Sequence, residues 1–332
     1  MVKRIFTFLF VLVLTVGVSS AKYNYLLATD APAGSLWVKF IEEINVKLQK
    51  KYNGEVEIKV YAGGTMRDQS SVIKKIKIGQ LSGAGLSSGG AQLIYKDFGV
   101  LGFPTLFRSY DEYDYIVSTM GGFFENEFEK NGFVLLGWTE VGFIYVFSKK
   151  PVASIEDLKN GKPCLMEGDI ISEALYKEAG IKPVQTKMSD ILTDLNTGRV
   201  ETVFNSTYGL LATQWFPKVS YMADFPITFM IGAIVVDKKL FYSMPKEYQD
   251  TMRNLFNEYM SKLTKKVRQD NESARDALTK KAGIKVLPVK DDQKKIFYDS
   301  CERASAQLTK GEFSAELYAK IKTTLEEYRK RR

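Results

Sequence analysis

The chain has 332 residues, is 45% hydrophobic and carries a formal net charge of +8, a composition typical of globular proteins. It contains no histidine, which removes His-based triads, the commonest general base and the usual nitrogen ligands of zinc, so we expect neither an enzyme nor a metal or cofactor site. Lysine and arginine are interspersed with aspartate and glutamate, as on solvated helix faces, so no nucleic-acid partner is expected.

Residues 1–21 have the features of a cleavable secretory signal. Lys3 and Arg4 precede an apolar run from Ile5 to Val18, and small residues follow. The run is shorter than the about 18–20 apolar residues that a membrane-spanning helix needs. We therefore expect an exported, periplasmic protein whose mature chain begins near Lys22.

The first half of the mature chain alternates between strands and helices. YNYLLAT, EVEIKVYAG and LSGAGLSSGG read as strands, with the helices LWVKFIEEINVKLQKKY and QSSVIKKIKIG between them. GLSSGG lacks the Lys-Ser/Thr ending of a phosphate-binding loop. A further helix, YDEYDYIVSTMGGFFENEFEKNG, precedes VLLGWTEVGFIYVFSKK, a long extended apolar run. This order predicts an α/β fold with parallel sheets flanked by helices.

The second half repeats this theme and adds one very long helix. IISEALYKEAG and SDILTDLNTG predict helices, VETVFNST a strand, and ITFMIGAIVVDKK a second extended run. Pro245 suits the first turn of a helix and Gly283 suits its end. At about 1.5 Å per residue, a helix between them would be over about 50 Å long, which exceeds one lobe.

The length of the mature chain favours two lobes. About 310 residues exceed one comfortable hydrophobic core. We expect lobe 1 to comprise 22–146 plus 234–265, and lobe 2 to comprise 147–233 plus 266–332. The two extended runs and the long helix would connect the lobes, and a small ligand would bind in the cleft between them.

Several stretches in both halves resemble one family. ALYKEAGIKPV followed by SDILTDLNTGRVETVFN is the strongest, and FPTLFRSYDEYDYI, SIEDLKNGK and LFYSMPKEYQDTM support it. Over essentially its whole mature length the chain resembles the DctP-type extracytoplasmic solute receptors of tripartite ATP-independent periplasmic (TRAP) transporters. The resemblance implies a two-lobe receptor that captures a small-molecule ligand and delivers it to a membrane permease. We expect it to act as a monomer.

The chain departs from the family at its ligand-binding positions. Receptors of this type usually read Asp-Leu-Lys-Gly-x-Lys-x-Arg, and that arginine holds the ligand's carboxylate. Here Asp157, Leu158, Lys159 and Lys162 match, and Cys164 takes the place of the arginine. A second basic position of the family falls on Ile144, and the Glu before the binding-site Asn falls on Phe204, whereas Asn205 itself matches.

These departures predict a neutral or largely apolar ligand. A carboxylate that enters a closed cleft without a cation loses hydration free energy on the order of several kcal/mol, because its charge is buried without a partner. We expect the cleft to be edged by Trp138, Ile144, Cys164, Phe204 and Trp215, with Asn205 as a hydrogen-bonding handle and Tyr208 nearby. The alternatives are organic-acid binding through a relocated basic residue, and a periplasmic lipid carrier or sensor.

Four further polar residues are candidates with two interpretations each. Glu140 and Glu167 lie next to expected cleft positions and would suit a cationic amine, or they are solvated carboxylates at strand ends. Ser87 and Ser88 would donate to a ligand from lobe 1, because loops at the carboxyl ends of strands line such clefts, or they serve only a turn.

The two cysteines, Cys164 and Cys301, have two interpretations as well. An exported chain allows them to form a disulfide, and two buried thiols are equally compatible with the sequence.

Overall fold

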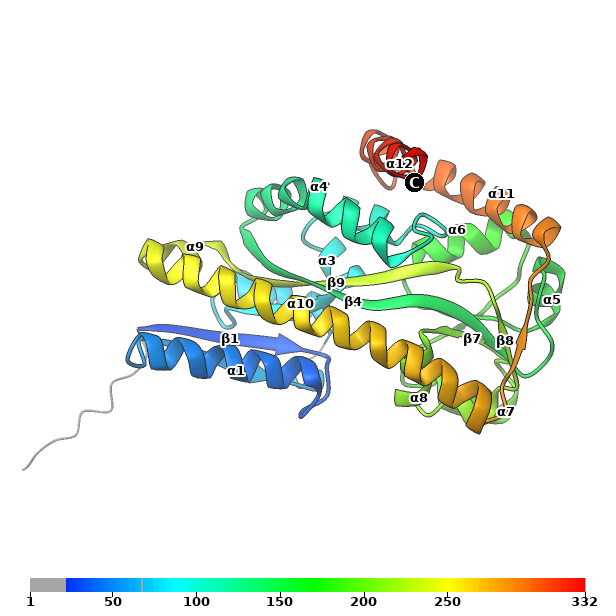
Figure 1. Ribbon diagram of the computed structural model, residues 1–332, viewed down its shortest axis with the longest axis horizontal. Coiled ribbons are helices and arrows are strands. Elements are labelled where there is room, and N and C mark those ends of the chain that lie inside the picture. Colours follow the sequence, from blue (N-terminus) through cyan, green and yellow to red (C-terminus); the bar gives the residue numbers. More distant parts are fainter. Residues whose placement is uncertain (1–21, 67, 332) are drawn as a thin grey trace, which may run out of the picture.

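The computed structural model describes residues 22–66 and 68–331, so the expected signal segment lies outside the described residues. Within those ranges, no helix combines the length and apolar character needed to cross a bilayer. The chain forms a mixed α/β structure in which one long helix, α10 (Lys246–Asp276), runs diagonally across almost the full length of the molecule (Figure 1). The predicted α/β class and the long helix are confirmed.

Lobe 1 is built on a sheet whose parallel part comes from the start of the chain. Its strand order is β2–β1–β3–β9–β4, with β1 and β2 parallel, β1 and β3 parallel, and the β3–β9 and β9–β4 pairs antiparallel. Its strands are β1 (Tyr23–Thr29), β2 (Val56–Tyr61), β3 (Gly83–Ser87), β4 (Phe133–Ser148) and β9 (Thr228–Asp237). Its helical segments are α1 (Leu36–Lys51), α2 (Gln69–Lys77), α3 (Ser88–Gln92), η1 (Lys96–Gly102), α4 (Tyr110–Lys130) and α9 (Lys238–Ser243).

Lobe 2 contains short strands around the end of β4, which pairs with β7 and β8, while β5 and β6 form a small parallel sheet. Its strands are β5 (Cys164–Met166), β6 (Val184–Thr186), β7 (Thr202–Asn205), β8 (Tyr221–Ala223) and β10 (Lys285–Leu287). Its helical segments are α5 (Ile155–Asn160), α6 (Ile170–Ala179), α7 (Ile191–Thr197), α8 (Thr207–Ala212), η2 (Phe216–Lys218), the π-helical turn η3 (Ala277–Lys281) and α11 (Asp291–Leu308).

β4 and α10 each contact elements on both sides of the predicted boundary. Residues 133–144 of β4 pair with β9 in lobe 1, whereas residues 145–148 pair with β7 and β8, so the change of partners lies next to the predicted boundary at 146. The helix α10 (Lys246–Asp276) starts directly after Pro245 and contacts α1 in lobe 1 and α8 in lobe 2. The helical segment ends before Gly283, whose φ of +75° is a left-handed conformation that glycine adopts without strain.

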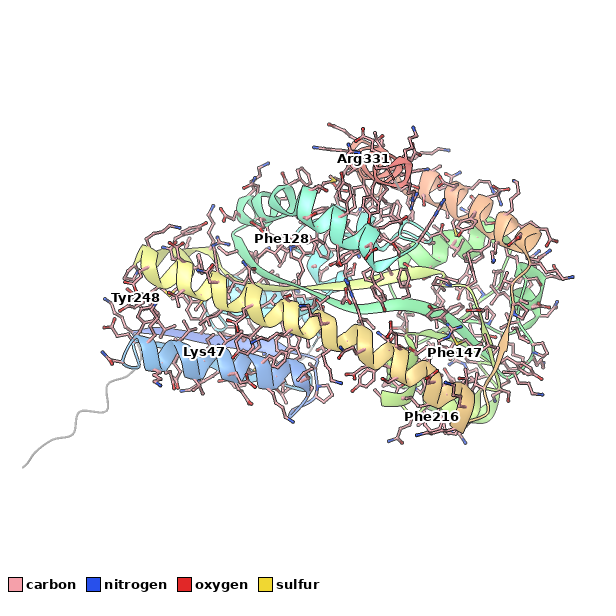
Figure 2. The ribbon with its side chains drawn as sticks, in the orientation of Figure 1. Lys47, Phe128, Phe147, Phe216, Tyr248 and Arg331 are labelled. Atoms are coloured by element: carbon pink, nitrogen blue, oxygen red, sulfur yellow. The ribbon has the colours of Figure 1, made fainter. Side chains whose placement is uncertain are left out.

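Buried side chains fill both faces of each sheet. In lobe 1, Phe128 belongs to the cluster under α4, and Met252 and Phe256 of α10 pack on the other face. In lobe 2, Phe147 packs among residues of α7, α8 and η3. Figure 2 shows Phe128 and Phe147 in separate parts of the molecule, one under α4 and one near the far end of α10. Each lobe therefore has its own core.

The C-terminal helix α12 (Ala315–Lys330) packs on lobe 1, although its sequence follows lobe 2. Leu317, Ile321 and Leu325 join the cluster under α4, and the side chain of Arg329 donates to Glu112 and to a backbone carbonyl of the loop before α4. By packing, residues 315–330 thus lie with the elements assigned to lobe 1. The division into two lobes that move against each other stays a prediction.

Candidate functional site

The loop after β1, the start of α2 and the end of β3 bring three polar side chains together at one edge of lobe 1. Gln69 Oε1 accepts hydrogen bonds from the backbone N–H of Ser87 at 3.2 Å and from its hydroxyl at 3.0 Å, and Gln69 Nε2 donates to Asp30. These bonds fix the orientation of the Gln69 amide. The carboxyl ends of parallel strands β1 and β3 lie at this edge, which is where ligands of α/β proteins bind.

A shallow, open pocket with room for about one water molecule lies beside this network. Its lining comes from the strand ends and the following loops: Ala28, Thr29, Asp30, Gly64, Met66, Gln69, Val72, Gly85 and Leu86. Gly85 permits the close approach of Trp37, since a Cβ there would lie 2.3 Å from Cζ2 of that ring. Among these lining residues, Asp30 is the one that carries a formal charge.

Three apolar side chains are exposed where the crossing strands meet lobe 2. Val141, Tyr208 and Met230 are 41%, 50% and 41% exposed, which is unusual for large apolar residues near buried strands. They lie around Asn271 of α10, whose Nδ2 donates to Val141 O at 2.9 Å and whose Oδ1 accepts from Tyr208 N at 3.1 Å. Met230 pairs in register with Gly142, the residue after Val141. Three exposed apolar side chains therefore lie near the place where α10 passes β4 and α8.

Cys164 lies in the core of lobe 2. It is 4% exposed, belongs to the same cluster as Phe147, and its carbonyl oxygen accepts a hydrogen bond from the Tyr176 hydroxyl at 2.8 Å. Burial raises the pKa of the Cys164 thiol to about 12. The group is therefore a neutral thiol and has no thiolate with which to act as a nucleophile.

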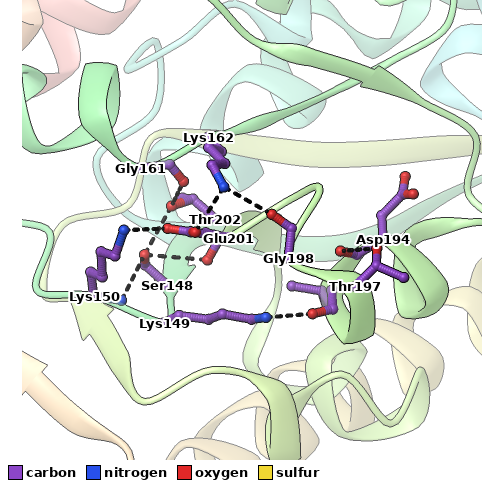
Figure 3. A network of polar contacts seen from close by, with 11 residues as sticks. Ser148, Lys149, Lys150, Gly161, Lys162, Asp194, Thr197, Gly198, Glu201 and Thr202 are labelled. Atoms are coloured by element: carbon purple, nitrogen blue, oxygen red, sulfur yellow. Dashed lines mark hydrogen bonds and ion pairs between the residues drawn. The ribbon is translucent and has the colours of Figure 1, made fainter.

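Polar contacts fix the turn that leads into Cys164 (Figure 3). Lys162 has a φ of +44°, and its Nζ donates to Gly198 O at 3.1 Å and pairs with Glu201 at 3.1 Å. Thr202 Oγ1 donates to Gly161 O at 2.8 Å. The segment is thus attached to β7, and its lysine is held by a neighbouring carboxylate.

The other predicted cleft residues, on β4, on β7 and after α8, fall into two groups. Ile144 and Trp215 are each 3% exposed. Phe204 and Asn205 are half-buried at the end of β7, where Asn205 pairs in register with Tyr145 and its Oδ1 accepts from Ser206 N at 2.9 Å. Asn205 and Tyr208 lie on either side of the start of α8, so these two are the predicted residues best placed to reach a ligand from lobe 2.

The remaining candidates are spread over the molecule. Trp138 stacks on Phe98 with ring centroids 5.6 Å apart and packs against the lobe 1 core. Glu167 is exposed, and its Oε2 lies 3.9 Å from Nζ of Lys187. The hydroxyl of Ser87 accepts from Gly90 N at 3.3 Å as the cap of α3, while Ser88 Oγ accepts from the Gln92 side chain at 3.4 Å. Both serines thus serve the turn into α3, and a ligand contact stays a prediction.

Glu140 is held by an arginine. Its carboxylate accepts from Nε of Arg268 at 2.8 Å and from Nη2 at 2.9 Å, and the same guanidinium binds Asp114 through two further hydrogen bonds and lies over the Tyr110 ring. Burial raises the pKa of Glu140, while Arg268 acts in the opposite direction. With this partner in place, the carboxylate is satisfied without a ligand amine.

Other basic side chains near the site also have carboxylate partners. Lys150 and Lys162 pair with Glu201 at 2.8 and 3.1 Å. Arg275 pairs with Asp224 at 2.6 Å and lies 5.6 Å from the ring centroid of Tyr145, the register partner of Asn205. Arg275 is therefore a cation within reach of the β7 end, although it already has a partner.

The sequence interpretation did not include Asp30, Gln69, Val141, Met230 and Asn271. The rule that placed Ser87 at the cleft, that loops after parallel strands line it, applies equally to Asp30 directly after β1. No sequence pattern indicates Gln69, because its place in the network depends on hydrogen bonds to Ser87 and Asp30, which lie in other parts of the chain. The cysteines are both free and belong to different clusters, so in this structure they are two buried thiols.

Comparison with known proteins identifies the family and the fold of this chain. Residues 27–311 match the family model DctP, described as bacterial extracellular solute-binding protein, family 7. The uncharacterized protein YiiZ of Salmonella typhimurium is 24% identical over 168 residues, which cover 49% of this chain and 51% of that protein, so the chain spans about half of that relative. The C4-dicarboxylate-binding protein DctB of Bacillus subtilis is 20% identical over 279 residues, covering 82% and 77%.

Solved structures show the same fold. A TRAP periplasmic solute-binding protein from Xanthobacter autotrophicus with bound β-D-galacturonate superposes with a TM-score of 0.79 at 20% identity, covering 91% of this chain and 98% of that one. Another from Ochrobactrum anthropi, with its C-terminus bound in the ligand-binding pocket, has a TM-score of 0.83 at 19% identity, covering 93% and 96%. The two-lobe fold and the family resemblance are confirmed, and a family of binding proteins agrees with the expectation of a non-enzymatic role.

Proposed function

Because the chain belongs to family 7 of the bacterial extracellular solute-binding proteins, we propose that it captures a small ligand between its lobes in the periplasm and delivers it to a TRAP-type permease. We propose further that this ligand is largely apolar and carries no carboxylate. The observation that supports this choice is Cys164, a buried neutral thiol where the family resemblance leads us to expect an arginine.

The environment of the site supports the same choice. The second expected basic position, Ile144, is apolar and 3% exposed, and the pocket at the edge of lobe 1 contains the Asp30 carboxylate. A carboxylate ligand would meet like charge there without a compensating cation among the lining residues. The exposed apolar side chains of Val141, Tyr208 and Met230 would instead suit an apolar body.

Organic-acid binding is the second candidate, because relatives are named for acids. The solved neighbours include a protein from Sulfurospirillum deleyianum with bound succinate and one from Pseudomonas putida with bound D-glucuronate. Arg275 beside Tyr145 is the basic residue that would take over the carboxylate. Arg67 is a second possibility by its position in the sequence between Met66 and Asp68, but it lies outside the described residues.

Thermal unfolding with added acids separates the two candidates. At 1 mM, succinate or D-glucuronate bound with micromolar affinity would add about 4 kcal/mol to the free energy of unfolding. We expect no shift of the melting temperature for the wild type, and none for Cys164→Arg, because Phe204 and Ile144 offer the new guanidinium no partner. A clear shift that disappears in Arg275→Gln or Arg67→Gln would show that the basic residue has moved and would overturn the proposed ligand class.

A further inference from the structure

We infer that Asn271 of α10 is a joint that fixes the angle between the two lobes. The inference goes beyond the proposed function, because it concerns how the lobes are held together and is independent of the chemistry of the ligand. Asn271 is buried where α10 passes β4 and α8. In the predicted division, β4 up to residue 146 belongs to lobe 1, whereas α8 and this part of α10 belong to lobe 2. A residue that is bonded to both β4 and α8 therefore connects the two lobes.

On the lobe 1 side, Asn271 binds a β-bulge. The register between β4 and β9 shifts between Glu140 and Gly142, so Val141 is the extra residue of β4. An extra residue of this kind is left unpaired in the ladder. The carbonyl oxygen of Val141 instead accepts a hydrogen bond from Asn271 Nδ2 at 2.9 Å. The approach is close, since a Cβ on Gly142 would lie 2.8 Å from the same nitrogen. The backbone of β4 is thus held to α10 at this point.

On the lobe 2 side, Asn271 holds the start of α8. Its Oδ1 accepts from the backbone N–H of Tyr208 at 3.1 Å, and the Thr207 hydroxyl donates to its backbone carbonyl at 2.6 Å. The first N–H groups of a helix have no acceptor within the helix, so the bond to Tyr208 satisfies one of them. One amide therefore donates to β4 and accepts from α8. Ionised aspartate would supply only the acceptor, and leucine would supply neither group.

A second link lies on the same face of α10. Arg268 is three residues earlier, which places it beside Asn271 on the helix surface, and it binds Glu140 and Asp114. That link joins side chains, which re-orient by changing rotamers. Asn271 instead binds backbone groups in both lobes, so lobe 2 cannot rotate against lobe 1 at this point without stretching one of its hydrogen bonds. Loss of the Asn271 amide should therefore let the lobes sample a wider range of angles.

The test measures the distance between the lobes with no added ligand. Nitroxide labels are attached to the full mature chain carrying Val46→Cys on α1 and Met188→Cys in the loop before α7; both positions are exposed, whereas Cys164 and Cys301 are buried. Double electron–electron resonance then gives the distribution of label distances. We expect a narrow distribution without further changes. In Asn271→Leu and Asn271→Asp the distribution should be about twice as wide, because lobes with fewer fixed contacts sample more orientations.

The matched control is Asn257→Leu, which replaces an exposed asparagine on the same helix and should leave the distribution unchanged. Gly142→Ala displaces the Asn271 amide from the opposite side and should also widen the distribution, so it decides the test if Asn271→Leu does not fold. An unchanged distribution in the folded Asn271 variants and in Gly142→Ala, even with a lower melting temperature, would overturn the inference. Equal widening in Asn257→Leu would do so as well. The ligand class is tested separately by the added acids, so either result leaves the proposed function intact.

Discussion

Replacing Arg268 by methionine tests how the ion cluster at the crossing strand contributes to stability. The change leaves Glu140, whose side chain is 1% exposed, without the guanidinium that donates to both of its oxygens at 2.8 and 2.9 Å. Asp114, the outer partner, is 51% exposed and can return to water. The main consequence of Arg268→Met is therefore a buried carboxylate without a partner.

The expected loss follows from these burials. Removing one partner of a buried ion pair costs about 3–5 kcal/mol, whereas an exposed pair contributes at most about 1 kcal/mol. For a chain of this size that loss corresponds to a drop in melting temperature on the order of 10 °C. The double variant Arg268→Met/Glu140→Gln should recover most of the loss, and Asp114→Asn should cost little.

The pH dependence gives a second readout. Burial raises the pKa of Glu140, and Arg268 limits that rise, so the variant should raise the pKa further. A carboxyl whose pKa is higher in the folded state than in the unfolded state stabilises the folded protein while it is protonated. This stabilisation is complete below the unfolded pKa of about 4.3 and is lost as the pH rises through the folded pKa. The loss in the free energy of unfolding of Arg268→Met relative to the wild type should thus grow between acid and neutral pH. Urea unfolding from pH 4 to 8 measures it, and a deficit that is small or independent of pH would refute the reasoning.

Three other predictions follow from particular contacts. Gly142→Ala should cost about 1–3 kcal/mol in urea unfolding, because φ is +99° and the new Cβ would lie 2.8 Å from Asn271 Nδ2; unchanged stability would contradict this. Cys164 and Cys301 should react with Ellman's reagent only after unfolding, and rapid reaction of the native protein would contradict their burial. Ligand binding should reduce the radius of gyration in solution scattering; no change at saturation, starting from an open unliganded form, would argue against a closing cleft.

The large elements could be predicted because their signals are local. The extended runs became β4 and β9, and the absence of helix breakers between Pro245 and Gly283 predicted the long helix. The position of α12 could not be predicted in the same way. Its apolar stripe predicts an amphipathic helix, but which core it covers depends on the path of the chain from lobe 2 back to lobe 1.

The candidate site was predictable only in part, because many of its contacts join residues that are distant in the sequence. Asn205 and Ser87 are the last residues of β7 and β3, and strand ends predict a ligand edge. Cys164 was expected at the cleft from the family resemblance, yet the side chain is buried among residues that come from several different elements. The contact of Asp30 with Gln69 joins residues far apart in the sequence, and no periodicity or spacing indicates it.

Native mass spectrometry of protein purified without refolding, followed by identification of the released small molecule, tests the central claim most directly. The account predicts a bound compound with an apolar body and no carboxylate. A released uronate, dicarboxylate or 2-oxo acid would contradict it, because Cys164 and Ile144 supply no cation for a buried carboxylate.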